Sequence, residues 1–327
     1  MRIVSFLPSA TEIACALGLR EQLVGITHEC DYPETVRTLP VVVRSAIDIV
    51  DRTPEQIDHA VREALRQGQS LYVVDEALLR ELEPDVILTQ DLCQVCAPSG
   101  NEVGRVLAHL PRAPRIVWLR PQCLEDILCS ILEVGEVVGV HDRSVALVQG
   151  LRDRIDVLRQ RLARVPERPR VCCLEWVSPL YSAGHWMPEL IALAGGESLC
   201  AESGKPSERI RWEDVREAAP DVLIVSPCGF DLERSVWQAG VLTRYPGWEA
   251  LPAVRNRRVY AVDANSYFAR PGPRVVDGAE LLASLLHPDR VSWGDRPPAA
   301  RKLTQADLIK LGETFEGNNS LQNDSER

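Results

Sequence analysis

The stretch HDRSVALVQGLRDRIDVLRQRLARVPERP, residues 141–169, lies near the middle of the chain and indicates how the two halves are joined. It predicts a helix of about 24 residues, roughly 36 Å long, that is stopped by Pro166 and Pro169. One side of this helix is apolar, because apolar residues recur at steps of three and four. They are Val148, Leu151, Ile155, Leu158, Leu162 and Val165. Such a helix is typical of a bridge between two lobes, and a hinge of two extended strands would not have this periodicity.

The sequence on either side of this helix follows one plan twice. Helical patterns alternate with short, continuous apolar strands, which predicts in each half a parallel sheet covered by helices on both faces. The corresponding segments, in the same order in each half, are 2–19 and 170–196, 78–90 and 214–226, and 112–120 and 255–263. In the first of them, Ser9 is the expected N-cap of a helix and Glu12 completes a capping box. The sequence therefore predicts an α/β fold of two parallel-sheet lobes joined by one long α-helix.

Four regions follow from this plan. We expect an N-terminal α/β lobe over residues 1–140, the linking helix over 141–166, a second α/β lobe over 167–290, and a polar, flexible tail over 291–327.

Composition and charge exclude several classes of function. The chain has 327 residues and a net charge of -10, so it has no basic excess with which to bind nucleic acid. No run approaches the roughly 20 apolar residues of a membrane helix, and the apolar run at the N-terminus is too short for a secretory signal. We therefore expect a cytoplasmic protein, or a periplasmic one if the start site is misassigned, in which the ten cysteines are free thiols or metal ligands rather than disulfides. We also expect a monomer.

Several motifs carry a resemblance to a known family. The opening RIVSFLPSATEIACALGLREQLVGITHECDYPETV looks like that of cobalamin-binding proteins, and EPDVILTQ (83–90) and SYFARPGPRVVDGAELLASLLHP (266–288) resemble later parts of them. The matching positions in the opening are Ser5, Pro8, Thr11, Glu12, Gly18, Val24, Gly25, Asp31, Tyr32 and Pro33. Over residues 2–288 the chain thus resembles the class III ABC-type solute-binding proteins for cobalamin, siderophores and haem.

The resemblance implies that the chain binds a corrinoid such as cobalamin in a cleft between its lobes, as a carrier, sensor or transport-associated receptor. It implies no catalysis, no required cofactor, and an ABC permease as partner if the chain is exported. A siderophore or haem remains open as the ligand, because relatives that bind them share this framework.

The expected ligand contacts lie in loops that follow the strands. A corrin is a broad, mostly apolar disc fringed with amides, so it favours flat aromatic side chains and a few hydrogen-bond donors. Each aromatic residue has an alternative role as a cap on the core, and each polar one as an ordinary loop residue. The candidates are Pro8, Ser9, His28, Tyr32, Gln90, Asp91, Trp176, Tyr181, Trp186, Phe230, Tyr267, Phe268 and Arg270.

A C-x-x-C pair, Cys93 and Cys96, departs from the cobalamin-binding pattern. The surrounding sequence does not match a thioredoxin fold, and no second C-x-x-C is present to close a zinc site. His28 and Cys30 could complete a metal site with the pair, or the two thiols could have no ligand role. The alternative of another class is a metal- or thiol-dependent enzyme that uses these four residues. Because G-x-S-x-G, H-E-x-x-H and a Gly-rich phosphate loop are all absent, we expect no enzyme.

Overall fold

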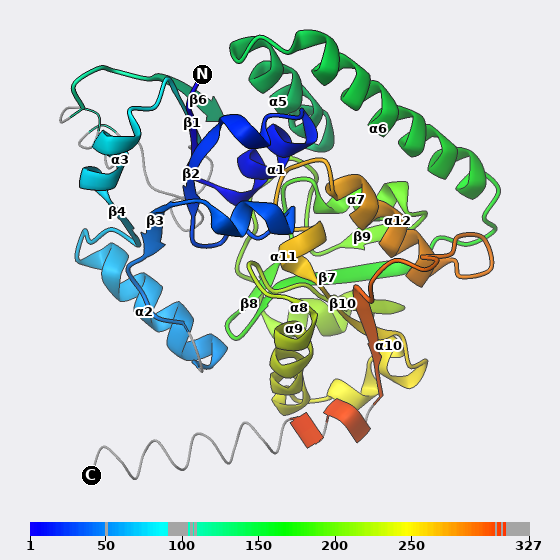
Figure 1. Ribbon diagram of the computed structural model, residues 1–327. Helices are drawn as coiled ribbons and strands as arrows, with labels where there is room; N and C mark the ends of the chain where they lie inside the picture. Colours follow the sequence, from blue (N-terminus) through cyan, green and yellow to red (C-terminus); the bar gives the residue numbers. More distant parts are fainter. Residues whose placement is uncertain are drawn as a thin grey trace, which may run out of the picture. The chain divides into compact units, whose positions relative to one another are not determined.

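The computed structural model describes residues 1–49, 52–90, 104, 107, 110–304, 306–308 and 310–311 (Figure 1). The chain forms two compact units. Unit 1 comprises Met1–Arg52, Ile57–Asp153 and Arg270–Pro273. Unit 2 comprises Thr53–Gln56, Arg154–Ala269 and Arg274–Arg327. Neither unit is a continuous stretch, which differs from the contiguous regions 1–140 and 167–290 expected from the sequence.

Unit 1 is built on a six-stranded sheet of order β4-β3-β2-β1-β5-β6. Its strands are β1 (Ile3–Ser5), β2 (Leu23–Thr27), β3 (Val41–Ser45), β4 (Tyr72–Val74), β5 (Val86–Gln90) and β6 (Arg115–Leu119). All neighbours run parallel except β3 and β4, which are antiparallel. The parallel sheet expected from the sequence is therefore present over five strands, and β4 is added to it as an antiparallel edge strand. β4 lies at the edge of the sheet and is only partly buried, which an antiparallel strand tolerates, whereas parallel strands are usually covered on both faces.

The helices described in unit 1 connect these strands. They are α1 (Pro8–Ala16), η1 (Arg20–Gln22), η2 (Glu34–Thr38), all but the first three residues of α2 (Pro54–Arg66), α3 (Glu76–Leu82), α5 (Leu124–Val137) and the first part of α6 (His141–Leu162). α1 begins at Pro8, one residue before the expected N-cap. Ser9 and Glu12 are instead buried inside the helix, so the expected capping box is wrong. Proline is well suited to this first helical position, since its missing N–H needs no partner there.

Unit 2 contains a second six-stranded sheet, of order β12-β11-β10-β7-β8, with β9 paired to β7. Its strands are β7 (Arg170–Val177), β8 (Leu180–Ser182), β9 (Glu197–Leu199), β10 (Val222–Val225), β11 (Val259–Val262) and β12 (Ala300–Leu303). β7, β9, β10 and β11 pair in parallel, whereas β8 and β12 are antiparallel to their neighbours. This sheet is also mixed. The helices described in unit 2 are the end of α6, α7 (Met187–Leu193), α8 (Trp212–Ala218), α9 (Leu232–Ala239), η3 (Gly240–Arg244), η4 (Trp248–Ala250), α10 (Pro252–Arg255), α11 (Ala264–Tyr267) and α12 (Val275–Leu286).

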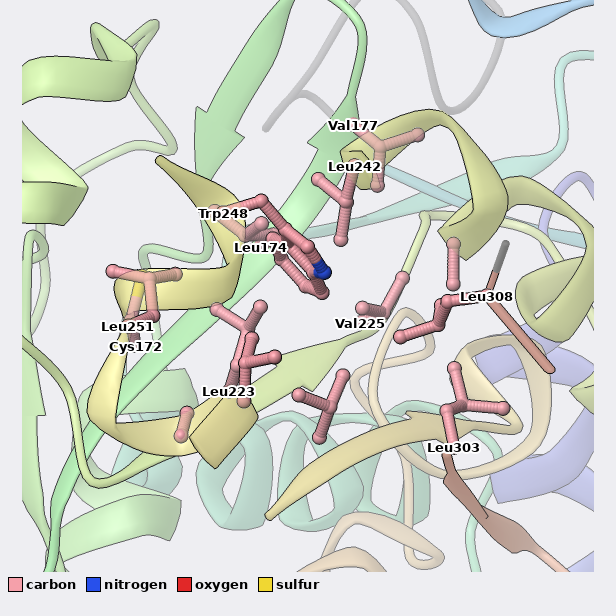
Figure 2. Packing of buried hydrophobic residues seen from close by; sticks show 14 of the residues in the cluster. Cys172, Leu174, Val177, Leu223, Val225, Leu242, Trp248, Leu251, Leu303 and Leu308 are labelled. Atoms are coloured by element: carbon pink, nitrogen blue, oxygen red, sulfur yellow. The ribbon is translucent and has the colours of Figure 1, made fainter. Parts of the chain in front are cut away.

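The core of unit 2 gathers on one face of this sheet. Figure 2 shows Cys172 and Leu174 of β7 packed in one cluster with Leu223 of β10, Leu303 of β12 and Trp248. In β10 and β11 every second residue takes part, because side chains alternate between the faces of a sheet. On the other face, Val171 of β7 lies near α7 and α12, so both faces are covered.

The linking helix is present, and its apolar stripe is confirmed. α6 runs from His141 to Leu162, from unit 1 into unit 2. The stripe from Val148 to Leu162 is buried, while Val165 lies beyond the end of the helix.

The expected flexible tail from residue 291 is wrong over its first part. β12 pairs antiparallel with β11, and Leu303 and Leu308 are buried in the core of unit 2. Trp293 stands edge-on to Tyr267 at 5.4 Å between ring centroids. Most residues from 291 onward are polar, but the few apolar ones among them, such as Leu303 and Leu308, pack in the core. The average composition of the tail did not predict this packing.

The internal correspondence between residues 78–90 and 214–226 is confirmed at the level of hydrogen bonds. In both, a helix ends in a residue with positive φ, followed by Pro-Asp and a parallel strand. The carboxylate of Asp85 accepts a bond from the backbone N–H of Arg2 at 2.8 Å. Asp221 accepts the equivalent bond from Arg170 at 2.9 Å. Asp85 therefore helps to hold β1 beside β5, and Asp221 helps to hold β7 beside β10.

Candidate functional site

In unit 1 the candidate residues follow the carboxyl ends of β1, β2 and β5. Pro8, Ser9 and Gln90 are buried. Tyr32, by contrast, is 48% exposed, and His28 is also exposed. The loop after β2 therefore presents the accessible candidates of this unit among the residues that the structure describes. Asp91 lies outside the described residues.

Arg270 is held inside unit 1 by two carboxylates. Its Nη1 donates to Asp31 Oδ1 at 2.5 Å and to Glu12 Oε1 at 3.1 Å, and its Nη2 donates to the carbonyl of Glu29 at 2.8 Å. The side chain of Arg270 is 5% exposed and that of Glu12 is 3% exposed. Burial alone would lower the pKa of Arg270, but the hydrogen bonds and charges of Asp31 and Glu12 raise it above its ordinary value. The residue expected to donate to a ligand thus binds groups of the protein itself.

Cys30 lies in the core rather than on the surface of the loop after β2. Its Sγ is 3.0 Å from Thr11 Oγ1 and 3.5 Å from Thr27 Oγ1. Burial raises the pKa of the Cys30 thiol, against hydrogen bonds from these two threonines that lower it. A thiol of this kind is a poor nucleophile and a poor metal ligand at neutral pH, because both roles need the thiolate.

The proposed metal site gains no support from the described part of the chain. No three His, Cys, Asp or Glu side chains among the described residues are placed to hold a metal ion. His28 is exposed, with Nδ1 3.3 Å from the carbonyl of Val43, whereas Cys30 is buried. Cys93 and Cys96 lie outside the described residues.

In unit 2, Trp176 is the candidate with the best defined surroundings. It lies at the end of β7, partly buried, with its ring 5.5 Å from that of Phe230 and tilted by 38°. Its Nε1 donates to the carbonyls of Ser178 at 3.1 Å and Pro54 at 3.3 Å. The Arg234 guanidinium lies 5.1 Å from the centroid of the Phe230 ring, on which it stacks. The orientation of the Trp176 ring is therefore fixed within the unit, with part of its surface left accessible.

Three of the six aromatic candidates of unit 2 are buried. Trp186 donates from Nε1 to the carbonyl of Phe268 at 2.9 Å, and both side chains are buried. Phe230 is buried as well. These residues cap the core, which is the alternative that the sequence left open for each of them.

Trp176, Tyr181 and Tyr267 remain partly accessible. Tyr267 packs between two side chains that the sequence analysis did not assign to a site, Trp293 and Arg274, whose guanidinium lies 5.6 Å from the centroid of the Tyr267 ring. The sequence feature that could have identified Trp293 as a packing residue is its position as an aromatic residue in an otherwise polar segment.

His185 is a further polar group near these aromatics. It has a left-handed backbone conformation with φ 52°, and its ring lies 5.6 Å from that of Trp186. Burial lowers the pKa of His185, so its imidazole is neutral at neutral pH and able to bind a metal-centred ligand. The accessible aromatic faces of unit 2 favour stacking with an apolar, planar molecule.

Two α/β units, each with its candidate contacts after the carboxyl ends of parallel strands, define the class III solute-binding fold. The chain belongs to the family described as periplasmic binding protein, whose sequence pattern matches residues 3–266. It is 26% identical to the vitamin B12-binding protein of Vibrio cholerae over 296 residues, which cover 87% of this chain and 88% of the relative.

Two solved structures have the same fold. The periplasmic vitamin B12-binding protein BtuF of Vibrio cholerae matches with a TM-score of 0.61 and 23% identity, over 87% of this chain and 96% of that one. A periplasmic heme-binding protein of Pseudomonas aeruginosa matches with a TM-score of 0.68 and 19% identity, over 88% of this chain and 93% of that one. The expected family and the two-lobed α/β class are confirmed.

The expected cytoplasmic location gains no support from these relatives, since the family and both solved structures are described as periplasmic. Within the described residues, every helix is too short or too polar to cross a membrane.

Proposed function

We propose that this chain is a binding protein for a corrinoid such as cobalamin and carries out no reaction on it. The observation that carries the proposal is the set of partly accessible aromatic residues in unit 2, above all Trp176 at the end of β7. The vitamin B12-binding relative supports the same ligand class, because it matches this chain along most of both sequences.

The fixed orientation of Trp176 suits a rigid, planar ligand. Its ring is positioned by its contact with Phe230 and by hydrogen bonds from Nε1 to two carbonyls. A side chain that is already ordered loses little further conformational entropy when a ligand binds. Tyr181 and Tyr267 offer similar flat surfaces, and their hydroxyl groups can bond the amides that fringe a corrin.

The test is a titration of the purified protein with hydroxocobalamin and with cobinamide, followed by tryptophan fluorescence and calorimetry. We expect saturable quenching with one ligand bound per chain. Trp176→Ala should weaken binding by roughly tenfold, the equivalent of about 1.4 kcal/mol of lost stacking. Trp118→Ala on β6 is the matched control and should leave the affinity unchanged. If neither corrinoid binds at millimolar concentration, the proposal is wrong.

Haem or a ferric siderophore is the second candidate ligand. The observations that favour haem are an exposed imidazole in unit 1, that of His28, and, independently, the neutral imidazole of His185 in unit 2. Adding haemin should then produce a shifted Soret band that His185→Ala or His28→Ala abolishes. Binding of a ferric siderophore with no response to haemin or corrinoid would favour the siderophore.

We also propose that the chain acts as a monomer that passes its ligand to an ABC-type permease. Membership of a periplasmic binding protein family supports this role. Light scattering at micromolar concentration tests the monomer, and fractionation of cells that produce the untagged protein tests its compartment. Recovery in the cytoplasmic fraction would favour a carrier or sensor instead.

A further inference from the structure

Two cysteines of unit 2 lie together on one face of its sheet. Cys172 is on β7 and is fully buried, and Cys200 directly follows β9 and is partly exposed. β7 and β9 run parallel, with Cys172 opposite Leu199. Cys200 packs against the same buried cluster that contains Cys172. The residue next to Cys200 is therefore the strand partner of Cys172.

The backbone at Cys200 explains how the two thiols come to the same face. If β9 continued past Leu199, the next side chain would point to the opposite face of the sheet. Cys200 instead has φ 64°, in the left-handed region, so the chain leaves the strand there and its side chain returns toward Cys172. The two thiols are hydrogen-bonded to each other.

The chemistry of the two thiols is unequal. The hydrogen bond with Cys172 lowers the pKa of Cys200, while the same bond, together with burial, raises the pKa of Cys172. Cys200 is also the more accessible of the two. It therefore has the properties of an attacking thiolate, and Cys172 those of a resolving thiol.

We propose that Cys172 and Cys200 are a dithiol site that a small-molecule disulfide, such as oxidised glutathione, converts into an intramolecular disulfide. The Cys200 thiolate attacks one sulfur of the oxidant, breaks its S–S bond and releases one thiol, which takes up the proton that Cys200 lost. Cys172 then gives up its proton and attacks Cys200 Sγ, which breaks the mixed disulfide and releases the second thiol. Two protein thiols are oxidised and one disulfide is reduced to two thiols, so the exchange balances.

The cross-link would close the chain from residue 172 to residue 200. That loop contains β8 and α7 and carries Trp176, Tyr181 and His185. Oxidation would therefore restrain the segment that holds several of the accessible candidate contacts, whatever ligand they bind. The site does not depend on the proposed corrinoid function.

The test is to reduce the full-length protein, remove the reductant, and incubate it with oxidised glutathione at neutral pH. We expect the intact mass to fall by two hydrogens without a glutathione adduct. Digestion after glutamate, without reduction, separates the two cysteines, because Glu175 and Glu197 lie between them. The fragment that contains Cys200 should be recovered joined to the fragment that contains Cys172.

Variants assign the bond and provide the control. Cys173 neighbours Cys172 but lies on the opposite face of β7, and burial raises the pKa of its thiol. Cys173→Ala should keep the cross-link, whereas Cys200→Ser and Cys172→Ala should each lose it. Oxidation should raise the melting temperature of the parent protein by roughly 5 °C or more and leave that of Cys200→Ser unchanged.

Three outcomes would overturn the proposal. One is a stable glutathione adduct on Cys200 with Cys172 still reduced. Another is a disulfide that joins a different pair of cysteines. The third is full retention of ten free thiols under conditions that oxidise a model dithiol peptide. Because Cys200 is partly exposed, Cys200→Ser should fold even if Cys172→Ala does not.

Discussion

Replacing Arg270 by methionine removes a guanidinium that binds the buried Glu12 carboxylate. Arg270 and Glu12 are 5% and 3% exposed, and their atoms Nη1 and Oε1 are 3.1 Å apart. Removing one partner of a buried ion pair leaves the remaining charge less well compensated and costs about 3–5 kcal/mol. Glu12→Gln should cost less, about 1.5–3 kcal/mol, because the amide oxygen of the glutamine can still accept a hydrogen bond from Arg270. The charge of Arg270 would also still be neutralised by Asp31, whose Oδ1 lies 2.5 Å from Arg270 Nη1.

The assay is denaturant unfolding followed by circular dichroism, with Arg37→Met as the matched control. The side chain of Arg37 is 62% exposed and lies 3.9 Å from the same Asp31, so its loss should cost less than about 1 kcal/mol. The double variant Glu12→Gln/Arg270→Met should be less destabilised than the sum of the two single variants, by about 1–3 kcal/mol. The reason is that the double variant no longer has the buried negative charge of the Glu12 carboxylate. Equal losses for Arg270→Met and Arg37→Met would refute this account of the buried pair.

Four further substitutions test packing and charge within the two units. Gly278→Ala should lower the melting temperature, since the new Cβ would lie 2.5 Å from a backbone oxygen, whereas Gly150→Ala in open space should stabilise α6 by roughly 0.5–1 kcal/mol; thermal unfolding of both measures the contrast. Leu303→Ala should cost about 2–5 kcal/mol in a denaturant titration, and a change near zero would mean that β12 does not pack as described. Burial raises the pKa of Glu280, but hydrogen bonds from arginines, chiefly Arg154, outweigh burial and lower the pKa overall. The ion pair therefore stabilises the folded protein at pH values above the ordinary glutamate pKa, and this stabilisation is lost as the pH falls through the lowered pKa of Glu280. Arg154→Met should therefore lower the melting temperature at pH 7 and have a diminishing effect on acidification; a deficit that stays constant with pH would contradict this.

The sequence predicted the elements whose cause is local. The stripe from Val148 to Leu162 identified α6 because helical periodicity is set by neighbouring residues. The apolar runs identified the central strands for a similar reason. The antiparallel edge strands β4 and β12 were missed, because both are short and partly exposed, and because the direction of an edge strand depends on the connection that precedes it.

The candidate site was predictable only in outline. The loops after the strands could be named from the strand pattern, and Trp176 and Tyr32 are accessible there. Whether an aromatic residue such as Trp186 faces solvent or the core depends on contacts with residues far along the chain, here Phe268. The role of Arg270 likewise depends on Glu12, which no local pattern links to it.

The interleaved composition of the units has a consequence for any attempt to divide the protein. A fragment that ends at residue 153 would lack Arg270, the residue that binds Glu12 and Asp31. A fragment that begins at residue 154 would lack Pro54, whose carbonyl accepts from Trp176. A chimaera with a relative, or an isolated unit produced for crystallisation, must therefore carry residues 270–273 with the N-terminal part and residues 53–56 with the C-terminal part.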